Sequence, residues 1–288
     1  MKPYRIGLYE KAMPKNLTWP EKLAVAKECG YDYVEISIDE TDEKLARLEW
    51  TAEERRELVR QMEEIGLPIR SMCLSGHRKY PLGATDPLVR ARGMEIMEKA
   101  IVLADDLGIR TIQLAGYDVY YEEGDADTEK WFCENLAKAT DMAAEAGVVL
   151  AFETMETPFM DTVGKAMKYV DLIGSPWLGV YPDIGNLKNA AVLYGHDTAE
   201  EMKLGKGHIF AVHLKETRPG VYRDMDFGQP DGHTEYASCI EESLKMGVRM
   251  FTGEFWHQKG NEDWMKTICS ASAFLREKIE SAAARLQL

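Results

Sequence analysis

Short apolar segments alternate with longer amphipathic segments along almost the whole chain. Eight of the short segments are nearly continuously apolar, as expected of strands that are covered on both faces. They are Arg5–Glu10, Tyr33–Ile38, Ile69–Ser75, Thr111–Gly116, Val148–Glu153, Leu178–Asp183, Ile209–Glu216 and Arg249–Phe255. The pattern therefore predicts eight buried strands.

The segments between these strands carry apolar residues at helical spacing. Thr51 followed by Glu54 is a capping-box pattern, which predicts the start of one helix. The tail Lys278–Leu288 is rich in alanine and charge, and we interpret it as a frayed helix end. The predicted helices are Trp19–Cys29, Ala52–Ile65, Pro87–Leu107, Glu129–Ala146, Val163–Ile173, Glu200–Leu204 and Glu235–Met246.

The repeated strand–helix unit indicates one fold class. Eight such units predict an α/β protein with a closed (β/α)8 TIM barrel. The chain has 288 residues, and such barrels usually need about 250 residues. No linker or low-complexity segment divides the sequence, so we expect residues 1–288 to form one TIM-barrel domain.

Composition and charge narrow the classes of partner. The chain is 45% hydrophobic and 29% charged, which is typical of a globular protein. Its net charge of −14 disfavours a nucleic-acid partner, because binding to the phosphate backbone requires a basic surface. A small phosphorylated molecule needs only a local positive region. No apolar run approaches the ~20 residues that cross a bilayer, and no membrane partner is expected.

The N-terminus and the cysteines indicate the compartment. No apolar signal region precedes the first strand. The five cysteines are scattered and form no C-x-x-C pair, which argues against a disulfide framework and against a cysteine zinc site. We therefore expect a reduced, cytoplasmic protein. The cysteines are Cys29, Cys73, Cys133, Cys239 and Cys269.

Ionisable residues stand at the ends of the last four predicted strands: Glu153, Asp183, His213 and Glu254. In a TIM barrel these strand ends meet at the catalytic face. Any one of them alone could be a strand-end charge that faces water. Three buried carboxylates, however, are costly unless a cation offsets them. The four residues therefore predict a site for one divalent metal ion; the oxygen ligands suit Mn²⁺, Mg²⁺ or Co²⁺, and the histidine also admits Zn²⁺.

Two of these residues are also candidate acid and base groups. Glu153 and Glu254 lie on strands that are not neighbours, so they would approach a substrate from opposite sides. One carboxylate would remove a proton beside a carbonyl, the metal would stabilise the enediolate, and the other would return a proton to the opposite face. Candidate substrate-binding residues are His77, Asn186 and Arg218, because each follows a predicted strand.

Several long motifs resemble the xylose-isomerase-like TIM-barrel superfamily, and within it the L-ribulose-5-phosphate 3-epimerases of ascorbate and L-sugar breakdown. The motifs are GLYEKAMP, VEISIDETDEKLARLEW, SMCLSGHRKYPLG, IQLAGYDVYY and YPDIGNL. The resemblance implies interconversion of L-xylulose 5-phosphate and L-ribulose 5-phosphate at C3. It gives Glu153, Asp183, His213 and Glu254 the metal positions and Glu153 with Glu254 the acid–base roles. Related ketose 3-epimerases have a histidine where this chain has Asn186.

Other readings of the same residues stay open. A sugar isomerase or a hydroxypyruvate-isomerase-like enzyme would use the same barrel, metal and enediolate but move the proton between C1 and C2. An inosose-dehydratase-like lyase is a third enzyme class on this scaffold. A DNA-repair endonuclease would need more histidines than the six present and a basic groove. A barrel that only binds a sugar phosphate would not need both glutamates. Homo-oligomers are common among such barrels, but no interface can be read from the sequence.

Overall fold

A parallel sheet of eight strands forms the centre of the computed structural model, which describes residues 3–288. The strand order is β6-β5-β4-β3-β2-β1-β8-β7. Bridges between Val180 and Ile209 and between Asp183 and His213 join the two end strands. The predicted barrel is therefore confirmed. The strands are β1 (Arg5–Tyr9), β2 (Tyr33–Ile38), β3 (Ile69–Leu74), β4 (Thr111–Ala115), β5 (Val149–Glu153), β6 (Leu178–Val180), β7 (Val212–Leu214) and β8 (Met250–Gly253).

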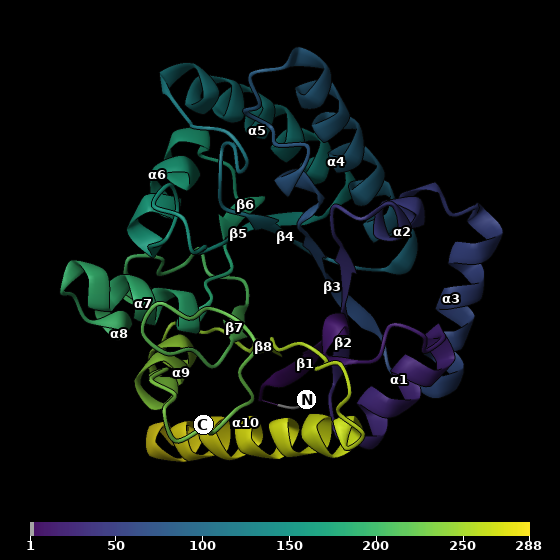
Figure 1. The fold of residues 1–288 in the computed structure, drawn as a ribbon, viewed down its shortest axis with the longest axis vertical. Coiled ribbons are helices and arrows are strands. Elements are labelled where there is room, and N and C mark those ends of the chain that lie inside the picture. The colour runs from purple at the N-terminus through teal and green to yellow at the C-terminus, as the bar shows by residue number, and fades with distance from the viewer. Residues whose placement is uncertain (1–2) are drawn as a thin grey trace.

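The helices form a ring around the strands (Figure 1). Three predicted helices, α3, α4 and α6, have the bounds that the sequence indicated. At the start of α3, Thr51 N–H donates to Glu54 Oε2 at 2.7 Å, as the capping-box pattern predicted. The helices are α1 (Trp19–Glu28), α2 (Asp42–Leu45), α3 (Ala52–Ile65), α4 (Pro87–Leu107), α5 (Ala126–Ala146), α6 (Val163–Ile173), α7 (Ile184–Tyr194), α8 (Thr198–Lys203), α9 (Tyr236–Lys245) and α10 (Trp264–Leu286).

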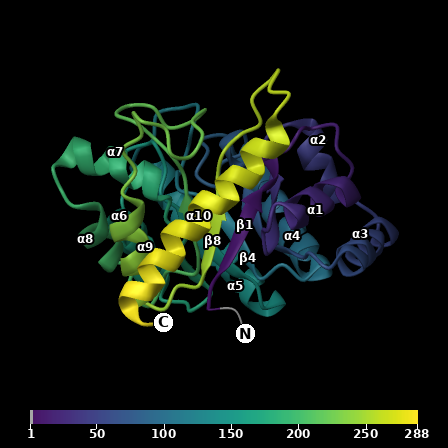
Figure 2. The same ribbon diagram turned by 90° about the horizontal axis from the view of Figure 1, so that it is seen from below.

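The C-terminal segment differs from the sequence interpretation. The structure continues α10 to Leu286, and Ile279, Ala282 and Ala283 are buried against the rest of the protein. The interpretation of the tail as a frayed helix end is therefore wrong, because one face of this helix packs into the core. Figure 2 shows α10 beside β1, the first strand of the chain.

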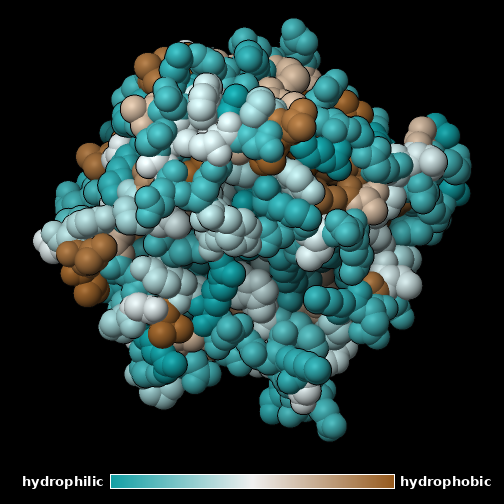
Figure 3. All heavy atoms as spheres, turned by 45° about the horizontal axis from the view of Figure 1, so that its top comes forward, coloured by the Kyte–Doolittle hydropathy of each residue, from teal (hydrophilic) through white to brown (hydrophobic). Residues whose placement is uncertain are grey.

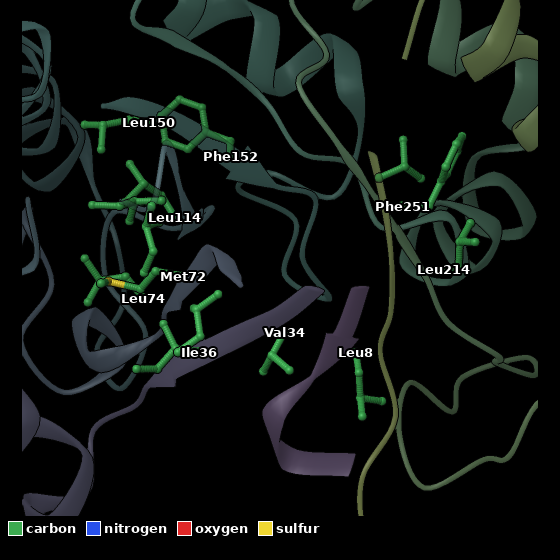
Figure 4. Close-up of a cluster of buried hydrophobic side chains, with 14 of the residues drawn as sticks. Leu8, Val34, Ile36, Met72, Leu74, Leu114, Leu150, Phe152, Leu214 and Phe251 are labelled. Carbon is green, nitrogen blue, oxygen red and sulfur yellow. The ribbon is translucent and has the colours of Figure 1, made fainter. Parts of the chain in front are cut away.

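The two sides of each strand have different chemical characters. Apolar residues such as Leu8, Ile36 and Phe152 belong to the main hydrophobic core and are completely buried (Figure 4). Because side chains alternate along a strand, the intervening positions point into the barrel. Several of these are polar, including Glu35 and Ser71, which makes the barrel interior a polar environment. The barrel thus combines an apolar outer layer with a polar centre.

Cys29 and Cys269 form a disulfide, although they are separated by 240 residues in the sequence. The sequence interpretation that argued against disulfides is wrong for this pair. Cys29 follows α1 and Cys269 lies in α10, and only the closed barrel brings their Cα atoms to 4.4 Å. The spacing of the cysteines carries no sign of this contact. Cys73, Cys133 and Cys239 are free thiols.

Polar side chains cover most of the face in Figure 3, and hydrophobic residues appear there in small separate groups. The charged fraction of the sequence accounts for this surface. Within residues 3–288, none of the helices combines the length and the apolar character that a membrane span requires.

Candidate metal centre and active site

Four side chains from the C-terminal ends of β5 to β8 meet inside the barrel mouth. Glu153, Asp183, His213 and Glu254 each offer one ligand atom, and these atoms all lie within 4.8 Å of one another. His213 Nδ1 is 3.3 Å from Glu254 Oε2, 3.7 Å from Glu153 Oε1 and 4.0 Å from Asp183 Oδ2. All four residues are buried. The structure thus brings together the four residues that the sequence selected.

Local structure explains why these atoms converge. Glu153 is the last residue of β5, and Glu254 follows β8 directly. Asp183 caps the N-terminus of α7, where its Oδ1 accepts a hydrogen bond from Asn186 N–H at 2.8 Å. This cap fixes the carboxylate and leaves Oδ2 facing the cluster. His213 is the central residue of β7 and points into the barrel.

The candidate ligand atoms have fewer partners than buried polar atoms normally have. Within residues 3–288, Asp183 Oδ2, His213 Nδ1 and Glu254 Oε2 are buried and make no hydrogen bond of good geometry, although the Lys215 ammonium group lies 2.9 Å from Asp183 Oδ2 and 3.2 Å from Glu254 Oε2. Leaving such atoms unsatisfied is costly, and a native structure normally offsets the cost. Carboxylate oxygens with one imidazole nitrogen are a suitable donor set for a divalent transition metal or for Mg²⁺. This buried group could therefore hold a metal ion.

Burial and neighbouring charges shift the pKa values of the two glutamates in opposite directions. Burial raises the pKa of Glu153, and the nearby Glu254 carboxylate raises it further. Burial acts in the same direction on Glu254, but Lys215 and His213 outweigh it and hold the pKa of Glu254 well below its ordinary value. Burial raises the pKa of Asp183 to about 8, although Lys215 opposes the shift. The two glutamates therefore differ in how readily they bind a proton, as an acid–base pair requires.

Glu35 orients the His213 ring through Nε2, the ring nitrogen that is not a candidate ligand atom. Its Oε1 lies 2.7 Å from His213 Nε2, and both side chains are completely buried. Ser71 Oγ and Tyr181 OH donate to the other oxygen of Glu35 at 2.7 and 3.0 Å. With the Glu35 carboxylate as acceptor, His213 carries its proton on Nε2, which leaves the Nδ1 lone pair for the cluster.

Lys215 is a member of this site that the sequence interpretation missed. Its Nζ lies 2.9 Å from Asp183 Oδ2 and 3.2 Å from Glu254 Oε2, and the residue is only 4% exposed. The signal for it was present in the alternation of β7, because a residue two positions beyond His213 points to the same side. The site therefore contains a buried cation besides the candidate ligands.

A cavity opens above the cluster. Asn186 lines it, and its Nδ2 donates to the Thr154 carbonyl oxygen at 2.8 Å. The Oδ1 atom of Asn186 has no hydrogen-bond partner within residues 3–288. The lining residues of this cavity are Tyr9, Lys11, Cys73, Ser75, Arg78, Glu153, Met155, Glu156, Asn186, Lys215, Tyr222, Arg223, Glu254 and Trp256.

The structure places His77 and Arg218 away from that lining. His77 lies in a 3-10 turn, Gly76–Arg78, and its Nε2 contacts the carbonyl oxygen of Gly93 in α4 at 3.0 Å. Burial lowers the pKa of His77 to about 4. Arg218 forms an exposed ion pair with Asp231 at 2.6 Å. Sequence order alone does not show which residue of a tight turn faces the barrel mouth.

Two arginines line the cavity instead. Arg78, the neighbour of His77, reaches the lining and lies over the ring of Tyr120 at 4.9 Å. Arg223 pairs with Glu156 at 3.1 Å, and Glu156 also accepts a hydrogen bond from Tyr120 OH. Glu156 lines the cavity but stays outside the group of candidate ligands. The wall of the cavity is therefore positive as well as acidic, which suits an oxygen-rich anionic ligand.

Comparisons with known proteins show what this chain is similar to. Residues 23–278 match the family model described as "Xylose isomerase-like TIM barrel". SgbU of Escherichia coli (strain K12) is 46% identical over 289 residues, which cover 98% of this chain and 99% of that protein. "L-ribulose-5-phosphate 3-epimerase UlaE" of Shigella boydii serotype 18 is 44% identical over 271 residues, with 91% and 93% of the two chains covered.

A solved structure extends the comparison of folds. "Structure of L-ribulose 3-epimerase" has a TM-score of 0.80 and 20% sequence identity, and the alignment covers 99% of this chain and 97% of that chain. At this identity the likeness concerns the fold alone.

Proposed function

The chain belongs to the xylose isomerase-like TIM-barrel family, and from that premise we propose that it interconverts L-xylulose 5-phosphate and L-ribulose 5-phosphate by inversion at C3. The observation that carries this proposal is the buried group of Glu153, Asp183, His213 and Glu254 at the barrel mouth. Its two glutamates come from β5 and β8, which are not neighbours in the sheet. Inversion requires a proton to leave one face of the substrate and to return to the other.

The chain's own residues divide the work of this reaction. Glu153, Asp183, His213 and Glu254 would hold one divalent ion, Zn²⁺, Mn²⁺, Co²⁺ or Mg²⁺. Bound there, the ion would polarise the substrate carbonyl and offset the charge of the enediolate. The ionised glutamate removes the C3 proton, and the protonated glutamate supplies a proton from the opposite side. The low pKa of Glu254 and the raised pKa of Glu153 support Glu254 as the first base for one direction.

The cavity supports a phosphorylated substrate. Lys11, Arg78 and Arg223 line the same cavity as the glutamates. Together they provide local positive charge in a chain whose net charge is −14. Such charge attracts an anionic sugar phosphate, and guanidinium groups can bind its oxygens through paired hydrogen bonds. Asn186 is proposed to accept a hydrogen bond from a substrate hydroxyl through its side-chain oxygen Oδ1, which has no partner within residues 3–288.

Exchange in heavy water tests the proposal. The protein is stripped with a chelator, reloaded with Mn²⁺ or Zn²⁺, and incubated with L-xylulose 5-phosphate in D₂O while the reaction is followed by NMR. We expect deuterium at C3 together with the appearance of L-ribulose 5-phosphate, and neither in the stripped protein. Deuterium at C1 or C2 would instead identify an isomerase, and loss of water from the substrate would identify a lyase.

A further inference from the structure

Lys215 occupies a position that is unusual for a lysine. Lysine side chains are rarely buried unless they are paired, and this one is 4% exposed between Asp183 and Glu254. It enters the barrel from β7, between the strands that carry the two carboxylates, two residues beyond His213. It also lines the cavity, where its Nζ is 5.9 Å from the centroid of the Trp256 ring. An ammonium group therefore stands beside the candidate metal ligands at the floor of the substrate cavity.

The oxygens that Lys215 contacts are the ones that a metal ion would use. Asp183 Oδ2 and Glu254 Oε2 also lie 4.0 and 3.3 Å from His213 Nδ1, the third candidate ligand atom. A divalent ion at the cluster would neutralise part of their charge and weaken their hold on the ammonium group. Lysine has four rotatable side-chain bonds and three N–H donors, so the group can turn toward another acceptor. The cavity that it lines offers space for such a turn.

We propose that Lys215 is a catalytic residue of the reaction proposed above, and that with metal and substrate bound it donates to the substrate oxygen that becomes negative in the enediolate. The inference rests on that proposed function. In the step, Glu254 takes the C3 proton, the C3–H bonding pair becomes the C2–C3 double bond, and the carbonyl π pair moves onto the C2 oxygen. Lys215 hydrogen-bonds this oxygen and keeps its own protons. Reprotonation on the opposite face by Glu153 reverses the electron movement.

Two other roles for Lys215 make different predictions. A lysine that only offsets the carboxylate charges would affect metal affinity and folding but not turnover of the metal-loaded enzyme. A lysine that only binds the substrate phosphate would affect KM. Its depth favours a role at the reacting carbon, because it contacts Asp183 and Glu254 while Arg78 and Arg223 provide other positive charges in the same cavity. A donor aimed at developing charge acts mainly on kcat.

The variant Lys215→Met removes the ammonium and keeps a similar volume. In metal-saturated enzyme we expect kcat to fall by about 10²-fold or more, as for the loss of one donor to a developing oxyanion. KM and the affinity for a pentitol 5-phosphate, which has no carbonyl, should stay within about fivefold of wild type, because no charge develops on that ligand. Metal affinity, measured by calorimetry, should be equal or tighter because a competing cation is gone.

The matched control is Lys188→Met, which also removes one positive charge. Lys188 lies on α7, forms an ion pair with Glu235 at 2.6 Å and is not part of the cavity lining. We therefore expect wild-type kcat for this variant. Should Lys215→Met fail to fold, Lys215→Gln provides a second test; it retains a neutral donor, and its kcat should still fall at least tenfold.

The outcomes separate the inference from the function on which it rests. Unchanged kcat in the Lys215 variants, beside a wild type that exchanges deuterium at C3, would overturn the catalytic role alone. A rise in KM without loss of kcat would assign Lys215 to phosphate binding and overturn the inference as well. A wild-type enzyme that fails to exchange deuterium at C3 with every metal would instead remove the proposed function itself.

Discussion

Replacing Glu35 by glutamine should weaken metal binding without touching a ligand. Glu35 Oε1 holds His213 Nε2 at 2.7 Å in a site with no exposed surface. A hydrogen bond to a charged group contributes about 1.5–3 kcal/mol, which corresponds to a roughly 10- to 150-fold change in affinity. Outer partners of metal-binding histidines change metal affinity by about 10- to 100-fold when they are mutated, which agrees with this range.

With glutamine at position 35, the proton of His213 is no longer held on Nε2, because the amide can present either its oxygen or its NH₂ group to the ring. If its amide nitrogen faces His213, the ring proton must move to Nδ1, where it would block the metal. Calorimetric titration of chelator-stripped protein with Mn²⁺ or Zn²⁺ measures the effect, and we expect the dissociation constant to rise about 10- to 100-fold. Ser71→Ala is the matched control, because it removes a donor to the other oxygen of Glu35 and leaves the His213 contact. Wild-type affinity in Glu35→Gln would show that the hydrogen bond from His213 to Glu35 does not support metal binding.

Three further predictions follow from the same structure. Glu254→Gln should keep substrate affinity within an order of magnitude and lower turnover by ~10²-fold or more, because it removes an acid–base group; steady-state kinetics measure this, and unchanged turnover would end the two-glutamate proposal. Burial lowers the pKa of His77 to about 4 in the folded protein, whereas the pKa of an unfolded histidine is about 6.5. Neutral His77 therefore stabilises the fold fully above about pH 6.5, and this stabilisation is lost as the pH falls from about 6.5 toward 4. Between pH 8 and pH 5 wild type should lose about 2 kcal/mol more unfolding free energy than His77→Gln in urea titrations; equal losses would contradict the shift. Reduction of the Cys29–Cys269 disulfide should lower the free energy of unfolding by about 2–5 kcal/mol, and an unfolding midpoint that dithiothreitol leaves unchanged would show that the bond contributes nothing.

Much of the fold was predictable because strands buried on both faces appear in the sequence as short, nearly continuous apolar segments. Helix bounds were most accurate where local signals mark them, as at α3 with its capping box. Helix α7 was missed because it begins directly after Asp183, which serves both as its cap and as a candidate ligand, with no polar loop between strand and helix. Most of α10 was missed because no strand follows it, so the alternation that located the other helices did not frame it.

Site residues were predictable where they belong to a strand, because side chains alternate between the two sides of a strand. Glu153 and His213 lie at such positions, and the structure brings their ligand atoms together. The direction of His77 was not predictable, because a three-residue turn sends it toward α4 and sends Arg78 to the cavity. Pairing of Cys29 with a residue in α10 depends on closure of the whole barrel. Local sequence patterns carry no information on such long-range contacts.

One divalent ion is expected to bind where the ends of four strands meet. Crystals of chelator-stripped protein soaked in Mn²⁺ and measured near the manganese absorption edge test it directly. We expect one anomalous peak per chain, within bonding distance of Glu153, Asp183, His213 and Glu254, and its disappearance in Asp183→Asn crystals. An anomalous peak elsewhere on the chain, with ordinary water at this position, would contradict it.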